Sequence, residues 1–157
     1  MNKQKIVYFL HLPKAAGSTL REVLLRQYSG AFCLAGSGGP HIWDTRLSEL
    51  SSDEKQRLQL VAGHIRHGQH DLINRKHTYI SMMRNPVKRI ISQFYYIKRH
   101  NGHTLHNWVC NNEFDLSGYV DAIPESKWWM IMENRQARRL AGLKPHRKEQ
   151  ANELVDR

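Results

Sequence analysis

The fold of this chain is decided by residues 5–20, which read KIVYFLHLPKAAGSTL. The apolar run Lys5–His11 is rich in β-branched and aromatic side chains, a pattern typical of a strand buried on both faces of a parallel sheet. Leu12–Thr19 contains a proline, a glycine and two hydroxyl side chains, which indicate a loop. Apolar residues then recur at helical spacing from Leu20 to Tyr28. The segment therefore predicts a strand, a loop and a helix in succession.

Two more apolar runs predict further strands. Leu60–His64 is typical of a short buried strand with His64 at its end, and Thr78–Met83 predicts another. Asn85 and Pro86 then provide an N-cap and the first residue of a helix. Strands that alternate with helices predict a three-layer α/β/α fold around a central parallel sheet. Ligands of such sheets bind beyond the carboxyl ends of the strands.

The helix expected after the third strand carries an apolar stripe, which we expect to face the core. Its members recur at intervals of three and four residues and are Val87, Ile90, Ile91, Phe94 and Tyr95. Lys88 and Ser92 fall together on a second face, which can hold a ligand. A later helix is expected over Glu125–Leu140, with Trp128 in the core and Gly142 as its stop.

The composition favours an anionic ligand. The chain has 157 residues, enough for one domain over residues 1–157, and its 24 Lys and Arg against 14 Asp and Glu give a formal net charge of +10. A nucleotide, a nucleic acid, an acidic polysaccharide or a membrane surface would each suit this charge. No stretch approaches the roughly 20 apolar residues of a membrane-spanning helix, so we expect no membrane span.

The two cysteines, Cys33 and Cys110, have the spacing of neither a disulfide framework nor a metal site. We therefore expect a reduced compartment and a cytoplasmic location. Cys33–Pro40 contains three glycines and a proline, which predict a flexible surface loop.

The loop before the first helix has the features of an anion site. A helix start presents backbone N–H groups and the positive end of the helix dipole. Lys14 adds a full charge, and Ser18 and Thr19 can donate hydroxyl hydrogen bonds. Gly17 lets the backbone approach an anion closely. Because Lys14 precedes Gly17 and no Gly-Lys-Ser/Thr occurs, the loop is not a Walker A motif.

These segments together resemble a known family. His11–Leu20 is similar to the 5′-phosphosulfate loop of sulfotransferases that use 3′-phosphoadenosine 5′-phosphosulfate (PAPS), especially the heparan and dermatan uronyl 2-O-sulfotransferases. Arg84–Ser92 resembles the Arg-Asp-Pro-x-x-Arg-x-x-Ser segment that holds the donor's 3′-phosphate, with Asn85 in place of the usual Asp. Gly63–Ile65 resembles the Gly-His segment that contributes the general base. Asn134–Gly142 also looks like a downstream family segment, to which we attach no role.

The resemblance implies a P-loop-like nucleotide-binding fold and transfer of a sulfuryl group from PAPS to a hydroxyl, on a carbohydrate acceptor. It implies catalytic roles for His64 as general base and for Lys14, which would stabilise charge on the leaving oxygen. No metal is required by this scheme. The residues implied in donor binding are Lys14, Ala15, Ala16, Gly17, Ser18, Thr19, Arg84 and Ser92. The common form of the loop has Thr-Gly in place of Ala15-Ala16 or nearby.

Other interpretations of these residues stay open. Arg84 and Ser92 would suit the exposed flank of any capped helix. His67 and His70 are alternatives to His64 as base. A metal site built from these three histidines would need a helix, which two neighbouring glycines disfavour.

Two other classes of function compete with a sulfotransferase. A nucleic-acid or polyanion binding module is supported by the net charge and by the basic stretch Arg135–Lys148, and it predicts salt-dependent binding without selectivity for a 3′-phosphate. A nucleotide-dependent kinase would need Mg²⁺ and a carboxylate to hold it, and the sequence has no obvious Walker B carboxylate. The resemblance ends near Gly142, whereas the family usually continues for several more elements. A chain truncated at its C-terminus, a minimal family member and a degenerate copy therefore all stay open.

Overall fold

In the computed structural model, the chain forms two compact units. The first unit comprises Met1–Met83 and Gln136–Leu143, and the second comprises Arg84–Arg135 and Lys144–Arg157. The residues that the structure describes are 5–28, 32–35, 47–124, 127–128, 131–132 and 134–142. The expectation of one domain over the whole chain stays a prediction.

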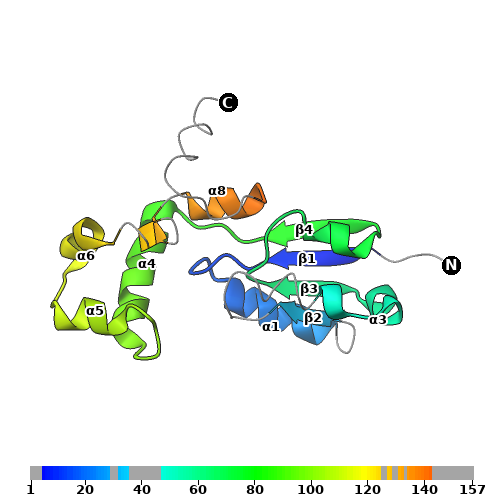
Figure 1. The fold of residues 1–157 in the computed structure, drawn as a ribbon, viewed down its shortest axis with the longest axis horizontal. Helices are drawn as coiled ribbons and strands as arrows, with labels where there is room; N and C mark the ends of the chain where they lie inside the picture. Colours follow the sequence, from blue (N-terminus) through cyan, green and yellow to red (C-terminus); the bar gives the residue numbers. More distant parts are fainter. Residues whose placement is uncertain are drawn as a thin grey trace, which may run out of the picture. The chain divides into compact units, whose positions relative to one another are not determined.

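The first unit is built on a four-stranded sheet with the strand order β2-β3-β1-β4 (Figure 1). All neighbouring strands are parallel. The strands are β1 (Ile6–Leu10), β2 (Phe32–Ala35), β3 (Leu60–Gly63) and β4 (His77–Ser81). The predicted central parallel sheet is confirmed, because the three predicted strands correspond to β1, β3 and β4.

Both faces of the sheet are buried. Successive side chains on each strand point to opposite faces. On one face, Phe9, Leu60 and Ala62 pack against Leu20 and Leu24 of helix α1, which spans Gly17–Gln27. The residues of the opposite face belong to a second cluster, which joins Ile6, Tyr8, Leu10 and Val61 to Leu47, Leu58, Ile73 and Leu140. The predicted three layers are therefore confirmed, with α1 and α8 (Arg135–Leu140) on opposite sides of the strands (Figure 1).

Two short helical segments connect the strands of this unit. Helix α3 (Ser52–Arg57) begins with a capping box, in which Ser51 and Glu54 each accept a hydrogen bond from the other's backbone N–H. The 3₁₀-helix η1 (Gln69–Ile73) follows β3 and places Ile73 in the core. Between them, these segments carry the chain from β2 to β3 and from β3 to β4.

The second unit is helical. Its helices are α4 (Pro86–Arg99), α5 (His106–Asn111) and α6 (Leu116–Ala122). Their shared core consists of Phe94, Ile97, Leu105, Val109, Tyr119, Ile123 and Ile131. The predicted start of α4 is confirmed, because the Oδ1 of Asn85 accepts a 3.1 Å hydrogen bond from the backbone N–H of Lys88 and Pro86 is the first helical residue.

The predicted core stripe of α4 is wrong at two positions. Val87 is 64% exposed and Tyr95 is 51% exposed, whereas Arg89 is 2% exposed and Gln93 is 6% exposed. The buried face is therefore turned toward Arg89 and Gln93. The guanidinium of Arg89 is tolerated there because it donates a hydrogen bond to the backbone carbonyl of Ile131.

Three further predictions need correction. The helix expected over Glu125–Leu140 is interrupted at Asn134, whose φ of 32° is left-handed, so that α8 begins only at the next residue. Trp128 is 42% exposed rather than in the core. Cys33 belongs to strand β2, so the predicted loop over Cys33–Pro40 is wrong for its first three residues, and its remainder lies outside the described residues.

Candidate active site

The carboxyl ends of β1, β3 and β4 meet at one edge of the sheet. Leu10 is in register with Gly63 on one side and with Ser81 on the other. The backbone N–H of His11 donates a 2.7 Å hydrogen bond to the carbonyl of Gly63, and the Oγ of Ser81 donates one of 2.8 Å to the carbonyl of Leu10. The loop after β1 and the residue after β3, His64, are thereby brought to the same edge.

The loop after β1 has a strained backbone. Lys14 has a φ of 64° and Ala16 a φ of 59°, both in the left-handed region. This conformation costs an L-residue with a Cβ roughly 1–2 kcal/mol, and such strain gathers at functional sites. Ala16 is also the N-cap of α1, and its methyl group cannot accept a hydrogen bond from the first N–H groups of the helix. The start of α1 is therefore suited to an external acceptor such as an anion.

Gly17 is the first residue of α1 and is buried against the ring of His11. A Cβ built on Gly17 would overlap the Cδ2 of His11 and would lie 2.7 Å from its Nε2. Any side chain at this position would push the loop away from the ring. Glycine is therefore required by the close approach of the loop to His11.

His64 is held with one ring nitrogen fixed. Its Nδ1 lies 2.7 Å from the backbone carbonyl oxygen of His11. A carbonyl only accepts, so the proton of this hydrogen bond belongs to Nδ1. In the neutral imidazole, Nε2 is then the nitrogen that carries the lone pair. The half-buried His64 is thereby set in the tautomer of a proton acceptor at Nε2.

The ring of His11 stacks against the ring of His64. The two rings are stacked with 4.6 Å between their centroids and an interplanar angle of 26°, and Phe9 stacks on His11 from 5.7 Å. Burial lowers the pKa of His11, and the nearby positive charges of Arg21 and Arg139 lower it further. His11 is therefore mostly neutral at neutral pH in the folded protein.

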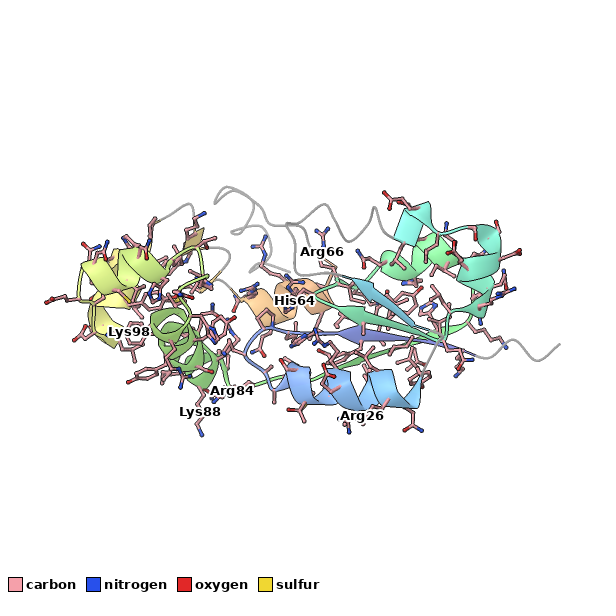
Figure 2. The ribbon with its side chains drawn as sticks, turned by 90° about the horizontal axis from the view of Figure 1, so that it is seen from below. Arg26, His64, Arg66, Arg84, Lys88 and Lys98 are labelled. Atoms are coloured by element: carbon pink, nitrogen blue, oxygen red, sulfur yellow. The ribbon has the colours of Figure 1, made fainter. Side chains whose placement is uncertain are left out.

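Arg139 of α8 supports the backbone that carries His64. Its Nη1 donates to the carbonyl of His64 and, over 3.3 Å, to that of Ile65. Burial and the charge of Arg66 lower the pKa of Arg139 to about 10, so it remains positively charged at neutral pH. Figure 2 shows His64 at the end of β3, beside α8.

Arg84 and Ser92 belong to the second unit. Arg84 is exposed and precedes the N-cap of α4, whereas Ser92 is half-buried two turns into the helix. Lys88 lies one turn before Ser92 on the same face and is exposed, and Figure 2 shows it with Arg84 at the first turn of α4. The structure thus brings the loop of Lys14–Thr19 and His64 to the same edge of the sheet in the first unit, and both Arg84 and Ser92 belong to the second unit.

A family model described as the sulfotransferase family matches residues 1–154. The chain belongs to the sulfotransferase family. No curated protein and no solved structure matches it. Membership shows that the protein is a transferase of sulfuryl groups, which requires a sulfuryl donor and an acceptor. In the part of the chain that the structure describes, no helix is long and apolar enough to cross a membrane.

The other histidines near this sulfotransferase site have different surroundings. His70 is hydrogen-bonded through Nδ1 to the hydroxyl of Tyr79 at 2.9 Å and stacks on His77 with 3.9 Å between centroids. His67 lies against Tyr79 with 4.6 Å between ring centroids. Among the described residues, no group of three or more His, Cys, Asp or Glu is arranged to hold a metal ion.

The sequence did not identify two residues of the candidate site. His11 is expected from the sequence only as the end of a strand, although it opens the segment that resembles the donor loop. Arg139 lies in the downstream segment that resembles the family without an assigned role. Neither residue could be placed from the sequence, because each contacts His64 across a long stretch of chain. The carbonyl of His11 accepts from the ring of His64, and Arg139 donates to the carbonyl of His64.

Proposed function

We propose that this sulfotransferase moves the sulfuryl group of PAPS to a hydroxyl of a carbohydrate, with His64 as the general base. The observation that carries the proposal is the hydrogen bond from His64 Nδ1 to the carbonyl of His11, which leaves Nε2 as the proton-accepting nitrogen. The same edge of the sheet carries the loop of Lys14 and the start of α1. A base and an anion site in one place are what sulfuryl transfer to a hydroxyl requires.

The proposed reaction is an in-line displacement at sulfur. The acceptor oxygen forms a bond to sulfur while the bond from sulfur to the bridging phosphate oxygen breaks, as in phosphoryl transfer. Nε2 of His64 takes the proton of the acceptor hydroxyl, which commonly accelerates a reaction by about 10²- to 10⁴-fold. Lys14 and the N–H groups at the start of α1 stabilise the negative charge that builds on the leaving oxygen.

The donor's 3′-phosphate is assigned to Arg84 and Ser92. An arginine can bind a terminal phosphate through two parallel hydrogen bonds, and a hydroxyl adds a third. The exposed guanidinium of Arg84 and the capped start of α4 support this role. These contacts would distinguish PAPS from a nucleotide that lacks the 3′-phosphate.

A carbohydrate acceptor is supported by the net charge of +10 and by the resemblance to the uronyl 2-O-sulfotransferases. A positive field raises the local concentration of an anionic glycan. The basic surface also favours a second candidate function, a binding module for polyanions. A cytoplasmic location stays a prediction.

The test is calorimetric titration of the protein with 3′-phosphoadenosine 5′-phosphate, the desulfated product of PAPS, with AMP as the comparison. We expect clear selectivity for the 3′-phosphorylated nucleotide. Arg84→Ala should weaken its binding by about 10- to 100-fold, the effect of losing a charge-assisted contact. Arg57→Ala, which removes an exposed arginine from α3, is the matched control and should leave binding unchanged.

Equal, weak and salt-sensitive binding of both nucleotides would instead support the polyanion module and contradict the proposed donor. If the donor product binds selectively, transfer of radioactive sulfate from PAPS to heparan or dermatan chains tests the acceptor class. Transfer to simple hydroxyl compounds but to neither glycan would keep the donor and reject the carbohydrate acceptor.

A further inference from the structure

The last turn of α8 and the residue that follows it lie across the segment from His64 to His67. The Nη1 of Arg139 donates to the carbonyls of His64 and Ile65. In the opposite direction, the backbone N–H of His67 donates a 3.0 Å hydrogen bond to the carbonyl of Arg139. One residue of α8 therefore holds this segment at three backbone groups.

The end of α8 is itself anchored. Leu140 packs against the core cluster on the face of the sheet opposite α1, and Gln136 is 6% exposed. Gly142 ends the helix with a φ of 73°, and a Cβ at this position would lie 2.8 Å from the carbonyl oxygen of His67. The backbone at the end of α8 therefore lies directly against His67. The backbone that carries Arg139 is thus packed against the core of the first unit.

We propose that Arg139 is a positioning residue that sets the tautomer and direction of the His64 ring. The side chain of His64 can reach the carbonyl of His11 only if its own backbone is held in place. Arg139 holds that backbone through the carbonyls of the two peptide bonds on either side of Ile65. The hydrogen bond from Nδ1 to His11 then directs the lone pair to Nε2. The catalytic meaning of this arrangement rests on the proposed function, whereas the tautomer itself does not.

The chemistry of the contact explains why an arginine stands here. A guanidinium presents several donors in a rigid plane and is more weakly hydrated than an ammonium, so it suits a partly buried site with adjacent carbonyls. Hydrogen bonds to a charged group are also stronger than neutral ones. A lysine would bring one compact charge without the fixed plane. The segment from Asn134 to Gly142, which the sequence left without a role, thereby acquires one.

The test is the protonation of the His64 ring in the unliganded protein, read by nitrogen-15 NMR at about pH 8, where an ordinary histidine is neutral. The signals of His64 are assigned with His64→Gln, in which they disappear. In the wild type we expect a protonated Nδ1 and an unprotonated Nε2. In Arg139→Met we expect averaged shifts at both nitrogens, since the ring is no longer directed to His11. Arg139→Lys should show a smaller fraction protonated at Nδ1 than the wild type.

The matched control is Arg57→Met, which removes an exposed arginine from α3 and should give the wild-type spectrum. Circular dichroism establishes which variants are folded. A wild-type His64 spectrum in either folded Arg139 variant overturns the proposal. If the tautomer changes as expected while the wild type fails to bind the donor product, the proposed function fails and the positioning role stands. If donor binding holds, kcat should fall in Arg139→Met, with a changed dependence of kcat on pH and unchanged affinity for the donor product.

Discussion

The Nδ1 of His64 lies 2.7 Å from the backbone carbonyl oxygen of His11, across two neighbouring parallel strands. The register that pairs Leu10 with Gly63 makes this contact possible, because the next residue of each strand is carried to the same edge. The parallel pairing of β1 with β3 therefore determines which tautomer His64 adopts. It also links the proposed base directly to the residue that opens the proposed donor loop.

His64→Ala should abolish most sulfuryl transfer while leaving the affinity for the donor product unchanged. Loss of a positioned base commonly lowers the rate by about 10²- to 10⁴-fold. The measurement is kcat for sulfate transfer, together with calorimetric titration of the nucleotide. His67→Ala is the informative companion, since His67 is the nearby alternative and is turned to Tyr79. A larger loss in His67→Ala than in His64→Ala would reverse the assignment of the base.

Gly17→Ala should destabilise the first unit and weaken donor binding, because the new methyl group would overlap the ring of His11. Overpacking of this kind commonly costs about 1–3 kcal/mol in the free energy of unfolding. Chemical denaturation gives the value. Gly17→Ala should lower the free energy of unfolding less in a His11→Ala background than in the wild type, because the obstructing ring is gone.

Gly102→Ala is the matched control for this prediction. Among the residues that the structure describes, no heavy atom beyond the two chain neighbours lies within 4 Å of a Cβ built at Gly102. The variant should therefore unfold at the same denaturant concentration as the wild type or slightly higher. Equal stability of Gly17→Ala and Gly102→Ala would show that the loop can move away from His11 at no cost.

The stability of the protein should fall as the pH is lowered below about 6.5, partly because of His11. Burial, Arg21 and Arg139 lower the pKa of His11 from 6.5 in the folded state. The unfolded chain therefore binds a proton at a higher pH than the folded protein does. The free energy of unfolding then decreases between pH 6.5 and the lowered pKa, and it is unaffected by this group above pH 6.5.

His11→Phe tests this account, because phenylalanine keeps a ring for stacking and cannot be protonated. Its unfolding free energy should depend less on pH than that of the wild type between pH 7.5 and 5.5 when both are measured by denaturation. The pKa of His103 is also lowered, mainly by burial, so His103→Phe should remove a similar part of the dependence in the second unit. An unchanged slope in both variants would contradict the assignment.

The sequence predicted the central features of the fold because their signals are local. The apolar run of β1, the glycine-containing loop and the spacing of α1 follow one another within 23 residues, from Lys5 to Gln27. Parallel strands also place their carboxyl ends at one edge, so His64 and the loop of Lys14 are both expected at that edge of the sheet. The roles of Lys14–Thr19 and His64 came instead from the resemblance of these segments to a family.

What the sequence could not predict depends on distant partners. Arg89 and Gln93 are buried although they are polar, because the carbonyl that accepts from Arg89 belongs to Ile131, 42 residues away. Arg139 supports His64 from 75 residues downstream. Strand β2 was missed since only four residues precede its glycine-rich continuation. Hydrophobic periodicity carries no information on contacts of this kind.

Asn85 should contribute measurably to the stability of the second unit. Its Oδ1 accepts from the backbone N–H of Lys88, and the loss of such an N-cap commonly costs about 1 kcal/mol. Asn85→Ala should therefore lower the free energy of unfolding by about that amount, measured by denaturation. Asn85→Asp keeps the acceptor oxygen and places a negative charge at the positive end of the α4 dipole, so it should be at least as stable as the wild type. A loss of stability in Asn85→Asp equal to that in Asn85→Ala would contradict this account, because the aspartate keeps the acceptor oxygen of the cap.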